Sequence, residues 1–183
     1  MLKATETIKI KDLEFEVLIN EAQIREKVFE IAQLINHDYA DKNPLLIGVL
    51  NGSFVFCADL YRELTIPSEI SFIRMASYEG TQSSGELKQL LGLSDNIFRR
   101  HVIIVEDIID TGRTMESILN HFKERGAKSV EICSLLVKPN SLEMKLDIRY
   151  KCFEISDEFV VGYGLDYDGQ GRNLKEIYQL PRE

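Results

Sequence analysis

The segment HVIIVEDIIDTGRTMESILNHFKER, residues 101–125, decides the fold. Its first six residues, HVIIVE (101–106), form a continuous apolar run of the length of a buried strand. The apolar spacing of Thr114–Arg125 then predicts a helix, which Gly126 ends in a C′ position. A buried strand, a tight polar loop and a helix therefore follow one another within 25 residues.

The same kind of unit recurs on both sides of this segment. A helix is predicted from Glu21 to about Tyr39, with Asn20 as its N-cap, and a second helical pattern, FVFCADLYREL, follows Asn51-Gly52-Ser53. Apolar strands alternating with helices are typical of a mainly parallel sheet flanked by helices, so we expect an α/β fold, and the absence of repeats and linkers predicts one domain over residues 1–183. The further expected strands are LLIGVL (45–50), SEISFIRM (68–75), SVEICSLLV (129–137) and EFVVGYG (158–164).

Composition excludes several classes of protein. The chain carries 22 Lys and Arg against 30 Asp and Glu, a net charge of −8, which disfavours a nucleic-acid partner because phosphate backbones are held by excess basic residues. No apolar run approaches the ~20 residues that span a bilayer, and no signal peptide is recognisable, so we expect no membrane partner and a cytoplasmic protein. Cys57, Cys133 and Cys152 lack CxxC or zinc-like spacing and are interpreted as buried thiols.

Acidic residues follow the buried strand directly. Glu106, Asp107 and Asp110 lie within five residues, and carboxylates at this point would be costly in a core, so we expect them to emerge into a cleft. In sheets of this type ligands gather at the carboxyl ends of the strands. The Thr-Gly-Arg-Thr loop that follows (111–114) offers a close backbone approach, two hydroxyl groups and the N–H groups of a helix N-terminus. Acids beside an anion cradle suggest a phosphorylated sugar, with Mg²⁺ as a further candidate for the carboxylates.

Other readings of the acidic loop fit less well. An aspartic protease also uses Asp-Thr-Gly, but it needs a second such loop and a β-structure in place of the helix. The spacing of Asp107 and Asp110 does not match the usual nucleophile loop of phosphoaspartate enzymes and receiver domains. Helix capping would explain one carboxylate, but not three in five residues. The polar segment ASYEGTQSSGELKQL (76–90) stays open between a surface hairpin and a mobile lid.

VIIVEDIIDTGRTM resembles the phosphoribosyl-pyrophosphate signature of type I phosphoribosyltransferases, and specifically that of their hypoxanthine (hypoxanthine-guanine) members. Four further blocks resemble the family in the same order, from about residue 45 to 180. They are LLIGVLNGSFVFCADL, FIRMASYEG, SLLVKP and EFVVGYGLDYDGQGRNL. The resemblance implies the type I phosphoribosyltransferase fold, with a small hood formed by the N- and C-terminal segments.

The resemblance also implies how the sugar donor, phosphoribosyl pyrophosphate, is bound. Glu106 and Asp107 would contact the ribose hydroxyls, and Thr111–Thr114 the 5′-phosphate. Asn51 stands where many members carry Lys or Arg, and Arg113 where mammalian relatives carry Lys. The substrate-binding residues implied on the donor side are Leu50, Asn51, Gly52, Glu106, Asp107, Ile109, Thr111, Gly112, Arg113, Thr114 and Arg172, with Ser77 and Tyr78 in the lid.

For the purine base and the metal, the resemblance implies a second group of residues. Asp110 would be the general base near purine N7, Lys138 would contact the 6-oxo group, Phe159 would stack on the base, and the Val160 backbone would read the base edge. Asp166 would join Glu106 and Asp107 near Mg²⁺. A cation at the 6-oxo oxygen favours oxopurines over adenine, whose amino group presents hydrogens to it.

The implied activity is Mg²⁺-dependent purine salvage: phosphoribosyl pyrophosphate and hypoxanthine, or guanine, give the nucleoside monophosphate and pyrophosphate. A homodimer or homotetramer is expected by resemblance. A regulator that keeps the donor pocket and binds RNA or DNA is the rival class, which the charge of −8 disfavours. No residue in the sequence decides between hypoxanthine, guanine and xanthine.

Overall fold

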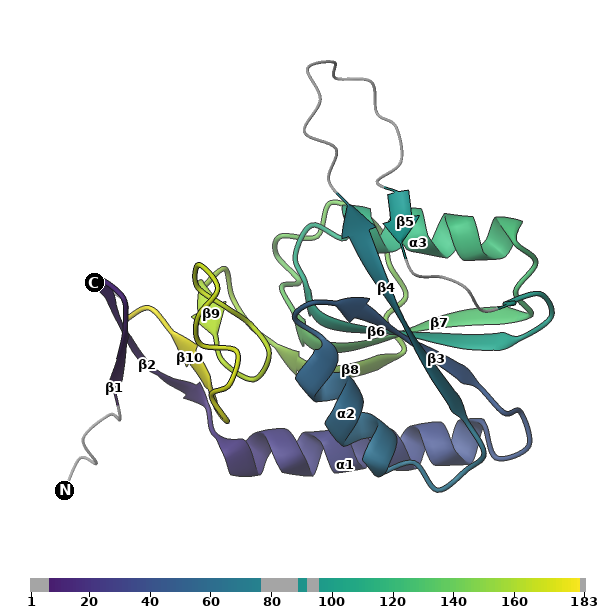
Figure 1. Cartoon of the computed structure of the whole chain (residues 1–183), viewed down its shortest axis with the longest axis horizontal. Coiled ribbons are helices and arrows are strands. Elements are labelled where there is room, and N and C mark those ends of the chain that lie inside the picture. The colour runs from purple at the N-terminus through teal and green to yellow at the C-terminus, as the bar shows by residue number, and fades with distance from the viewer. Residues whose placement is uncertain (1–6, 77–88, 92–95, 182–183) are drawn as a thin grey trace, which may run out of the picture.

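The computed structural model describes residues 7–76, 89–91 and 96–181 of the chain. Its larger sheet has six strands in the order β5-β4-β3-β6-β7-β8 (Figure 1). Five of them run parallel and β5 pairs antiparallel with β4 at one edge, which confirms the predicted α/β class. Their bounds are β3 Leu45–Leu50, β4 Glu69–Ala76, β5 Gln89–Leu91, β6 His101–Ile109, β7 Ser129–Val137 and β8 Tyr150–Glu154.

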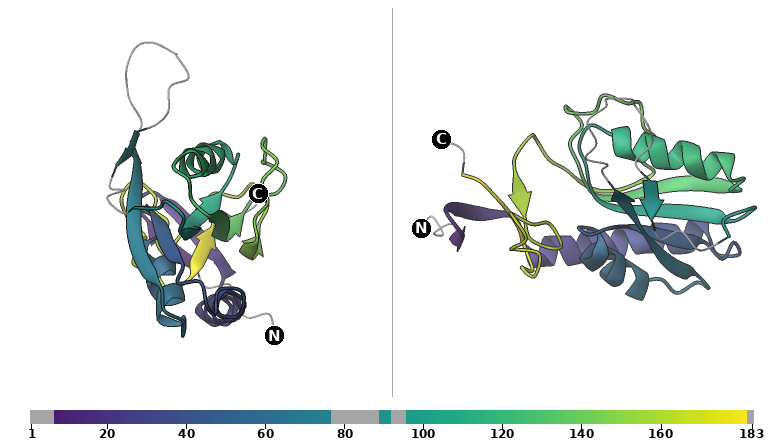
Figure 2. Two further views of the ribbon diagram at one scale, coloured as in Figure 1. Left: turned by 90° about the vertical axis from the view of Figure 1, so that its right-hand side faces the viewer. Right: turned by 45° about the horizontal axis from the view of Figure 1, so that its top comes forward.

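Three helices in the described residues cover the two faces of this sheet. Helices α1 (Glu21–Asp38) and α2 (Phe54–Arg62) lie on one face and α3 (Arg113–Glu124) on the other (Figures 1 and 2). Because side chains alternate along a strand, β6 serves both layers. Ile103 and Val105 pack in the cluster under α1 and α2, whereas Val102 and Ile104 pack in the cluster under α3. This double burial explains why the central strands are continuous apolar runs.

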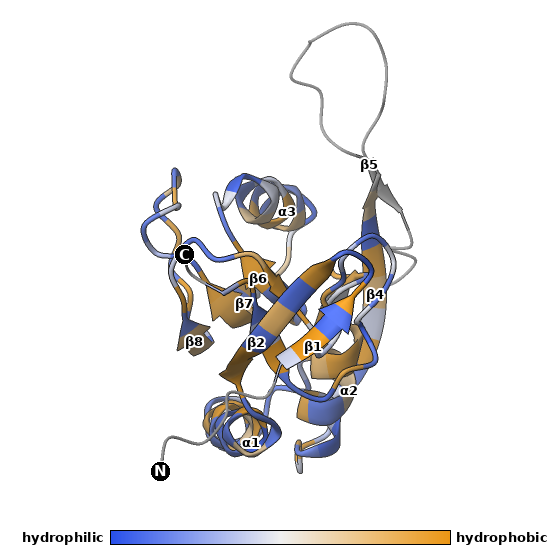
Figure 3. Ribbon diagram, turned by 90° about the vertical axis from the view of Figure 1, so that its left-hand side faces the viewer, coloured by the Kyte–Doolittle hydropathy of each residue, from blue (hydrophilic) through white to orange (hydrophobic). Residues whose placement is uncertain are grey.

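A second sheet, in the order β1-β2-β10-β9, stands at one end of the molecule (Figure 1). Its strands are β1 Thr7–Ile10, β2 Leu13–Ile19, β9 Val160–Val161 and β10 Ile177–Gln179, so segments from both ends of the sequence meet there. Apolar and polar residues alternate over Leu13–Val17 of β2 (Figure 3), and Phe15 packs inward with Ile10, Val161 and Tyr178. This sheet is the expected hood of N- and C-terminal segments.

Several local predictions are confirmed. Asn20 caps α1 in a capping box, in which its side chain accepts from the Gln23 N–H at 3.0 Å and the Gln23 side chain accepts from the Asn20 N–H. Gly126 follows α3 with a φ of 74°, the left-handed conformation that favours glycine. Cys57, Cys133 and Cys152 are free and buried, and burial raises the pKa of the Cys57 and Cys152 thiols to about 12.

Two expected strand limits were wrong. The strand predicted at 101–106 continues to Ile109, so Glu106 and Asp107 lie inside β6 and not beyond its end. The strand predicted at 158–164 is reduced to Val160–Val161, which belongs to the hood, because Gly162, Tyr163 and Gly164 all have positive φ and end the extended backbone. No helix in the described part of the chain is long and apolar enough to cross a membrane.

Asp38 at the end of α1 ties this helix to β8. Its Oδ2 accepts from Arg149 Nη2 and from the Tyr150 hydroxyl, both at 2.8 Å, and these bonds lower its pKa from 3.8 to about 2. A carboxylate whose pKa is lower in the folded state stabilises the fold above the unfolded pKa, and this stabilisation is lost as the pH falls toward 2.

We therefore expect Asp38→Asn to reduce the free energy of unfolding by about 1–2 kcal/mol at neutral pH. The difference from the unmodified chain should shrink between about pH 4 and pH 2, because protonation then removes the same charge. Urea unfolding at both ends of this pH range measures it. Glu26→Gln, at an exposed position of the same helix, is the control and should change the free energy of unfolding much less.

Candidate active site

The loops that follow β3, β6 and β7 meet at one edge of the sheet, because parallel strands end on the same side. A methyl group added at Gly52, after β3, would overlap the Asp107 carboxylate on β6. The Lys138 N–H, after β7, donates to the Ile109 carbonyl at 2.9 Å. A methyl group added at Gly164, in the loop after β9, would overlap the Gly52 carbonyl. These contacts bring together segments that the sequence analysis assigned to one site.

The loop after β6 forms an anion cradle. Gly112 has a φ of 82° and is the N-cap of α3, and no side chain caps the helix. The first N–H groups of α3 therefore face a cavity of about 150 Å³ without a side-chain acceptor. The cavity is lined by Glu106, Ile108, Ile109, Asp110, Thr111, Gly112, Thr114 and Met115. Its lining includes Ile109, Thr111, Gly112 and Thr114 of the predicted donor site.

Arg113 points elsewhere in this structure. Its guanidinium forms an ion pair with Glu143, with Nε at 2.6 Å from Oε2, and the Arg113 side chain does not line the cavity. The Thr111 carbonyl accepts from the Glu143 N–H at 3.0 Å, so the pair ties the loop before α3 to the segment after β7. The Arg113 N–H still belongs to the first turn of α3. The structure therefore does not bring the Arg113 guanidinium into the predicted anion site.

The buried Glu106 and the half-buried Asp107 form an acidic pair. Glu106 is 9% exposed, and its Oε2 has no hydrogen-bond partner among the described residues. Burial, and next the neighbouring Asp107, raise the pKa of Glu106 well above its usual range. A buried oxygen without a partner implies a missing donor or cation. The carboxylates thus suit the hydroxyls of a sugar or a hard cation. Position 52 must be a glycine to leave room for the Asp107 carboxylate, because a methyl group there would overlap it.

Asp110 and Lys138 form a contact that the sequence did not reveal. The Lys138 ammonium donates to Asp110 Oδ2 at 3.2 Å, from the ends of the neighbouring strands β6 and β7. The Lys138 side chain is 12% exposed and that of Asp110 53%, so the pair has a buried cation and an accessible carboxylate. A proton acceptor and a cationic donor therefore stand side by side beside the anion cavity.

The hood supplies an aromatic face. Phe159 is exposed although it lies among aromatic residues, with its ring centroid 5.9 Å from Tyr167 and 6.3 Å from Phe15. Its carbonyl accepts from the Leu180 N–H at 3.3 Å, and the next residue, Val160, is buried in β9. An exposed ring held by a fixed backbone is a surface on which a planar ligand can stack.

Asp166 and Arg172 are joined to each other. Arg172 Nη2 lies 2.5 Å from Asp166 Oδ1, and Arg172 Nη1 donates to the Gly164 carbonyl at 2.6 Å. Asp166 Oδ2 accepts from the Gly169 N–H at 2.7 Å. The loop between β9 and β10 is therefore closed by its own charged residues, and both side chains remain about a quarter exposed.

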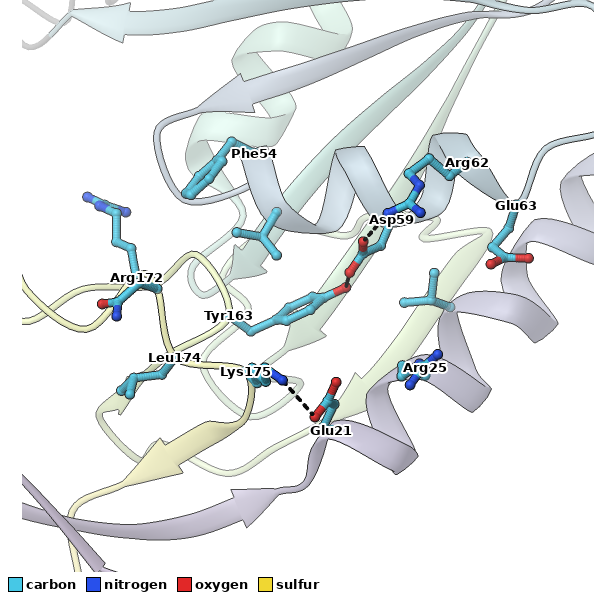
Figure 4. Close-up of a pocket in the computed structure, with 13 residues that line it drawn as sticks. Glu21, Arg25, Phe54, Asp59, Arg62, Glu63, Tyr163, Arg172, Leu174 and Lys175 are labelled. Carbon is cyan, nitrogen blue, oxygen red and sulfur yellow. Dashed lines mark hydrogen bonds and ion pairs between the residues drawn. The ribbon is translucent and has the colours of Figure 1, made fainter.

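Tyr163 anchors this loop to α2, a role that the sequence analysis missed. Figure 4 shows its ring reaching from the loop across to Asp59, and its hydroxyl donates to Asp59 Oδ2 at 2.7 Å. Burial, and next this carboxylate, raise the Tyr163 pKa. A cavity of about 640 Å³ lies here between α1, α2 and the loop. The anchor fixes Gly164 against Gly52 and so aligns the loop of Asp166 and Arg172 with the loop after β3.

Tyr163→Phe removes this hydrogen bond and keeps the ring. We expect a loss of about 1 kcal/mol in the free energy of unfolding. Because the anchored loop carries Asp166 and Arg172, the KM for the substrate bound there should rise several-fold with kcat nearly unchanged. Tyr61→Phe is the control, since it removes a part-buried hydrogen bond from α2 to the Ser68 carbonyl, outside this loop. Equal effects of the two variants would contradict an anchoring role.

Some predicted residues cannot be placed. Ser77 and Tyr78, the predicted lid residues, lie outside the described residues. Within the described ranges no three His, Cys, Asp or Glu side chains gather into a metal site. The Leu50–Asn51 peptide bond is cis, and Asn51 is exposed at the start of the loop that covers Asp107.

Comparison with known proteins places the chain in a family. The protein-family model for the phosphoribosyl transferase domain matches residues 18–168 of the chain. The chain belongs to the phosphoribosyltransferase family. Among curated members, the hypoxanthine-guanine phosphoribosyltransferase of Streptococcus mutans is 46% identical over 168 residues, which cover 91% of this chain and 93% of the relative. The corresponding Streptococcus pneumoniae protein is 43% identical over the same shares.

Solved phosphoribosyltransferases share the whole architecture. A crystal structure of a hypoxanthine-guanine phosphoribosyltransferase from Bacillus anthracis has a TM-score of 0.84 and 41% identity, covering 95% of this chain and 100% of that one. A ternary substrate complex of the hypoxanthine phosphoribosyltransferase of Trypanosoma cruzi has a TM-score of 0.84 and 35% identity, covering 97% and 96%. The type I phosphoribosyltransferase fold expected from the motifs is thus confirmed.

Proposed function

We propose that this chain transfers the 5-phosphoribosyl group from phosphoribosyl pyrophosphate to hypoxanthine, and also to guanine, in a Mg²⁺-dependent purine-salvage reaction. The products are IMP or GMP and pyrophosphate. The observation that carries the proposal is the Asp110–Lys138 pair beside the anion cradle at the start of α3. The named activity of the relatives that cover most of the chain supports it.

The donor fits the cradle and the acidic pair. A 5′-phosphate suits the uncapped N–H groups of α3 and the hydroxyls of Thr111 and Thr114, because helix N-termini favour anions. The ribose hydroxyls would then lie toward Glu106 and Asp107, whose carboxylates would accept hydrogen bonds from them. The pyrophosphate would face the loop after β3 and Arg172. In this arrangement the anomeric carbon is held while the base approaches.

The base fits the Asp110–Lys138 pair. In an oxopurine N7 and the 6-oxo oxygen lie on the same edge of the ring. Asp110, the accessible partner, can take the N7 proton while the buried Lys138 ammonium donates to the oxygen. Adenine would present amino hydrogens to this ammonium, which disfavours it. Phe159 supplies the stacking face, and Val160 the backbone for the base edge.

Mg²⁺ fits the donor set of the site. Carboxylate oxygens are its preferred protein ligands, and Glu106 offers a buried oxygen without a partner. Glu106 and Asp107, adjacent in β6, are the residues that would hold it, whereas the third predicted ligand, Asp166, is paired with Arg172 and does not gather with them in the described part of the chain. Oxygens of the phosphoribosyl pyrophosphate would complete the shell. When bound, the cation neutralises the negative charge of the leaving pyrophosphate. A cytoplasmic location and a homodimer or homotetramer belong to the same proposal.

The test is pyrophosphate release from the donor by the purified chain with Mg²⁺. Hypoxanthine, guanine, xanthine and adenine are compared in parallel, and competing-substrate kinetics rank the oxopurines. We expect turnover with hypoxanthine and guanine, almost none with adenine, and a steep loss of donor affinity on adding a chelator. Absence of turnover with every oxopurine would overturn the proposal. Tight nucleic-acid binding at low salt by an inactive chain would favour the rival regulator.

A further inference from the structure

A second charged cavity lies at the opposite end of the larger sheet from the candidate active site. It has a volume of about 250 Å³ and is formed where the chain enters three neighbouring parallel strands, β3, β6 and β7. In Figure 1 this is the end of the molecule away from the hood. The lining residues are Asp41, Lys42, Asn43, Arg99, Arg100, His101 and Lys128. We call it the basic pocket.

The basic pocket carries an excess of positive charge in a chain of net charge −8. Arg100 is neutralised by Glu69, with Nη2 at 2.8 Å from Oε1. Lys42 donates to the Asp38 carbonyl at 2.6 Å and so keeps its charge. Arg99 and Lys128 form no ion pair within the described residues. Asp41 is the single acid in the lining. The cations not paired with Glu69 outnumber it, and they are Lys42, Arg99 and Lys128.

His101 reports the sign of the field in the basic pocket. Its Nδ1 lies 2.6 Å from Ser129 Oγ, and its ring meets Tyr39 edge-on with centroids 6.0 Å apart. Burial first, and then the charges of Lys128 and Lys42, lower the pKa of His101. These two causes disfavour a charge on the imidazole, so the positive charge of the basic pocket is carried by its lysine and arginine side chains.

The loops that present these charges are fixed by their backbones. Arg99 has a φ of 58° and Asn43 a φ of 43°, conformations that residues with side chains rarely adopt. The Arg99 N–H donates to the Gly126 carbonyl and the Lys128 N–H to the Arg100 carbonyl, both at 2.8 Å. The loop before β6 and the loop before β7 thus hold each other, so the backbone that carries these cations is fixed.

We propose that the basic pocket binds a small phosphate-type anion, either free or as the terminal phosphate of a small ester. Phosphate is the ligand that several converging lysine and arginine donors recognise best. The volume is below the ~300–1,000 Å³ of sites for drug-sized molecules, which favours one or two phosphate groups over a whole nucleotide. The site is separate from the cradle of α3, because β6 runs roughly 25 Å between the two.

The location allows a test that the active site does not disturb. In proton NMR the Hε1 resonance of His101, assigned with His101→Gln, is followed during titration with inorganic phosphate, pyrophosphate and ribose 5-phosphate at constant ionic strength. We expect a saturable shift and a rise in the His101 pKa, because a bound anion offsets the charges of Lys128 and Lys42. Comparison of the three ligands distinguishes a free phosphate from an ester.

Arg99→Ala/Lys128→Ala should weaken this binding by about tenfold or more, since two charge-assisted contacts are removed. Lys27→Ala/Arg62→Ala, which changes the net charge equally on α1 and α2, should leave it unchanged. Lys128→Gln, expected to weaken it several-fold, replaces the double variant if that one unfolds. A His101 shift that never saturates, or equal affinity in the basic-pocket variants and the control, would overturn the proposal.

Discussion

Asp110→Asn is expected to lower kcat by about 10²–10⁴-fold while donor affinity stays within about twofold of the unmodified chain. Asparagine has the same shape, and its side-chain oxygen can still accept from Lys138, which lies 3.2 Å from the carboxylate. It cannot take the proton of the base, so the loss falls on the chemical step. Steady-state kinetics with hypoxanthine and calorimetric titration with the donor separate the two quantities.

The control for this variant is Asp147→Asn, in the segment between β7 and β8, where no interaction of the carboxylate with the candidate site is recorded. It should retain nearly full turnover. If Asp110→Asn loses donor binding as strongly as turnover, Asp110 supports the architecture of the loop and is not the base.

Gly52→Ala is expected to reduce kcat/KM for the donor by about 10²-fold, the effect of displacing a positioning group by about 1 Å. The added methyl group would occupy the space of the Asp107 carboxylate, and the backbone of Gly52 does not itself require glycine, since its φ lies outside the left-handed region. The loss therefore measures displacement of Asp107 and of the loop after β3. Kinetics with varied donor concentration at saturating hypoxanthine give the value.

Gly126→Ala, after α3 and away from the candidate site, separates this steric effect from a general effect of replacing a loop glycine. Its φ of 74° makes alanine unfavourable by about 1 kcal/mol or more, but the methyl group would meet only the exposed ring of Phe98. We expect lower stability with donor kinetics close to normal. A donor KM that is unchanged in Gly52→Ala would mean that Asp107 can move without cost and does not position the sugar.

The central sheet could be predicted because its signals are local. LLIGVL, HVIIVE and SVEICSLLV are buried on both faces, so each reads as a continuous apolar run whatever it pairs with. The N-cap of α1 and the glycine after α3 are also local, and both were found. The end of β6 was misplaced because a buried Glu106 breaks the apolar run while the strand goes on.

The hood could be expected only from resemblance. Strand β1 is mostly exposed and β10 has three residues, so neither shows a clear period of hydrophobicity. Their pairing joins segments far apart in the chain, such as Gln179 with Glu16, 163 residues away. Short half-buried strands of this kind are stable only through such partners, and one sequence does not display them.

The acidic residues of the candidate site were found from the motif, but their partners were not. Asp110 meets Lys138 across 28 residues, Arg113 meets Glu143 across 30, and Tyr163 meets Asp59 across 104. Each pair depends on which strands are neighbours in the sheet, a property of the topology. The cis peptide bond between Leu50 and Asn51 is not followed by a proline, so the sequence carries no local signal that predicts it.

Because β10 is near the C-terminus, the hood can be completed only late in synthesis of the chain. Strand β10 lies between β2 and β9 in this sheet. Residues 13–19 are synthesised early, but they can pair with β10 only after residues 177–179 have been synthesised. The parallel sheet from β3 to β8 can assemble while translation continues, whereas the stacking face of Phe159 is framed only afterwards. A nascent chain that stops before Ile177 would have the cavity at the start of α3 without the complete hood around Phe159.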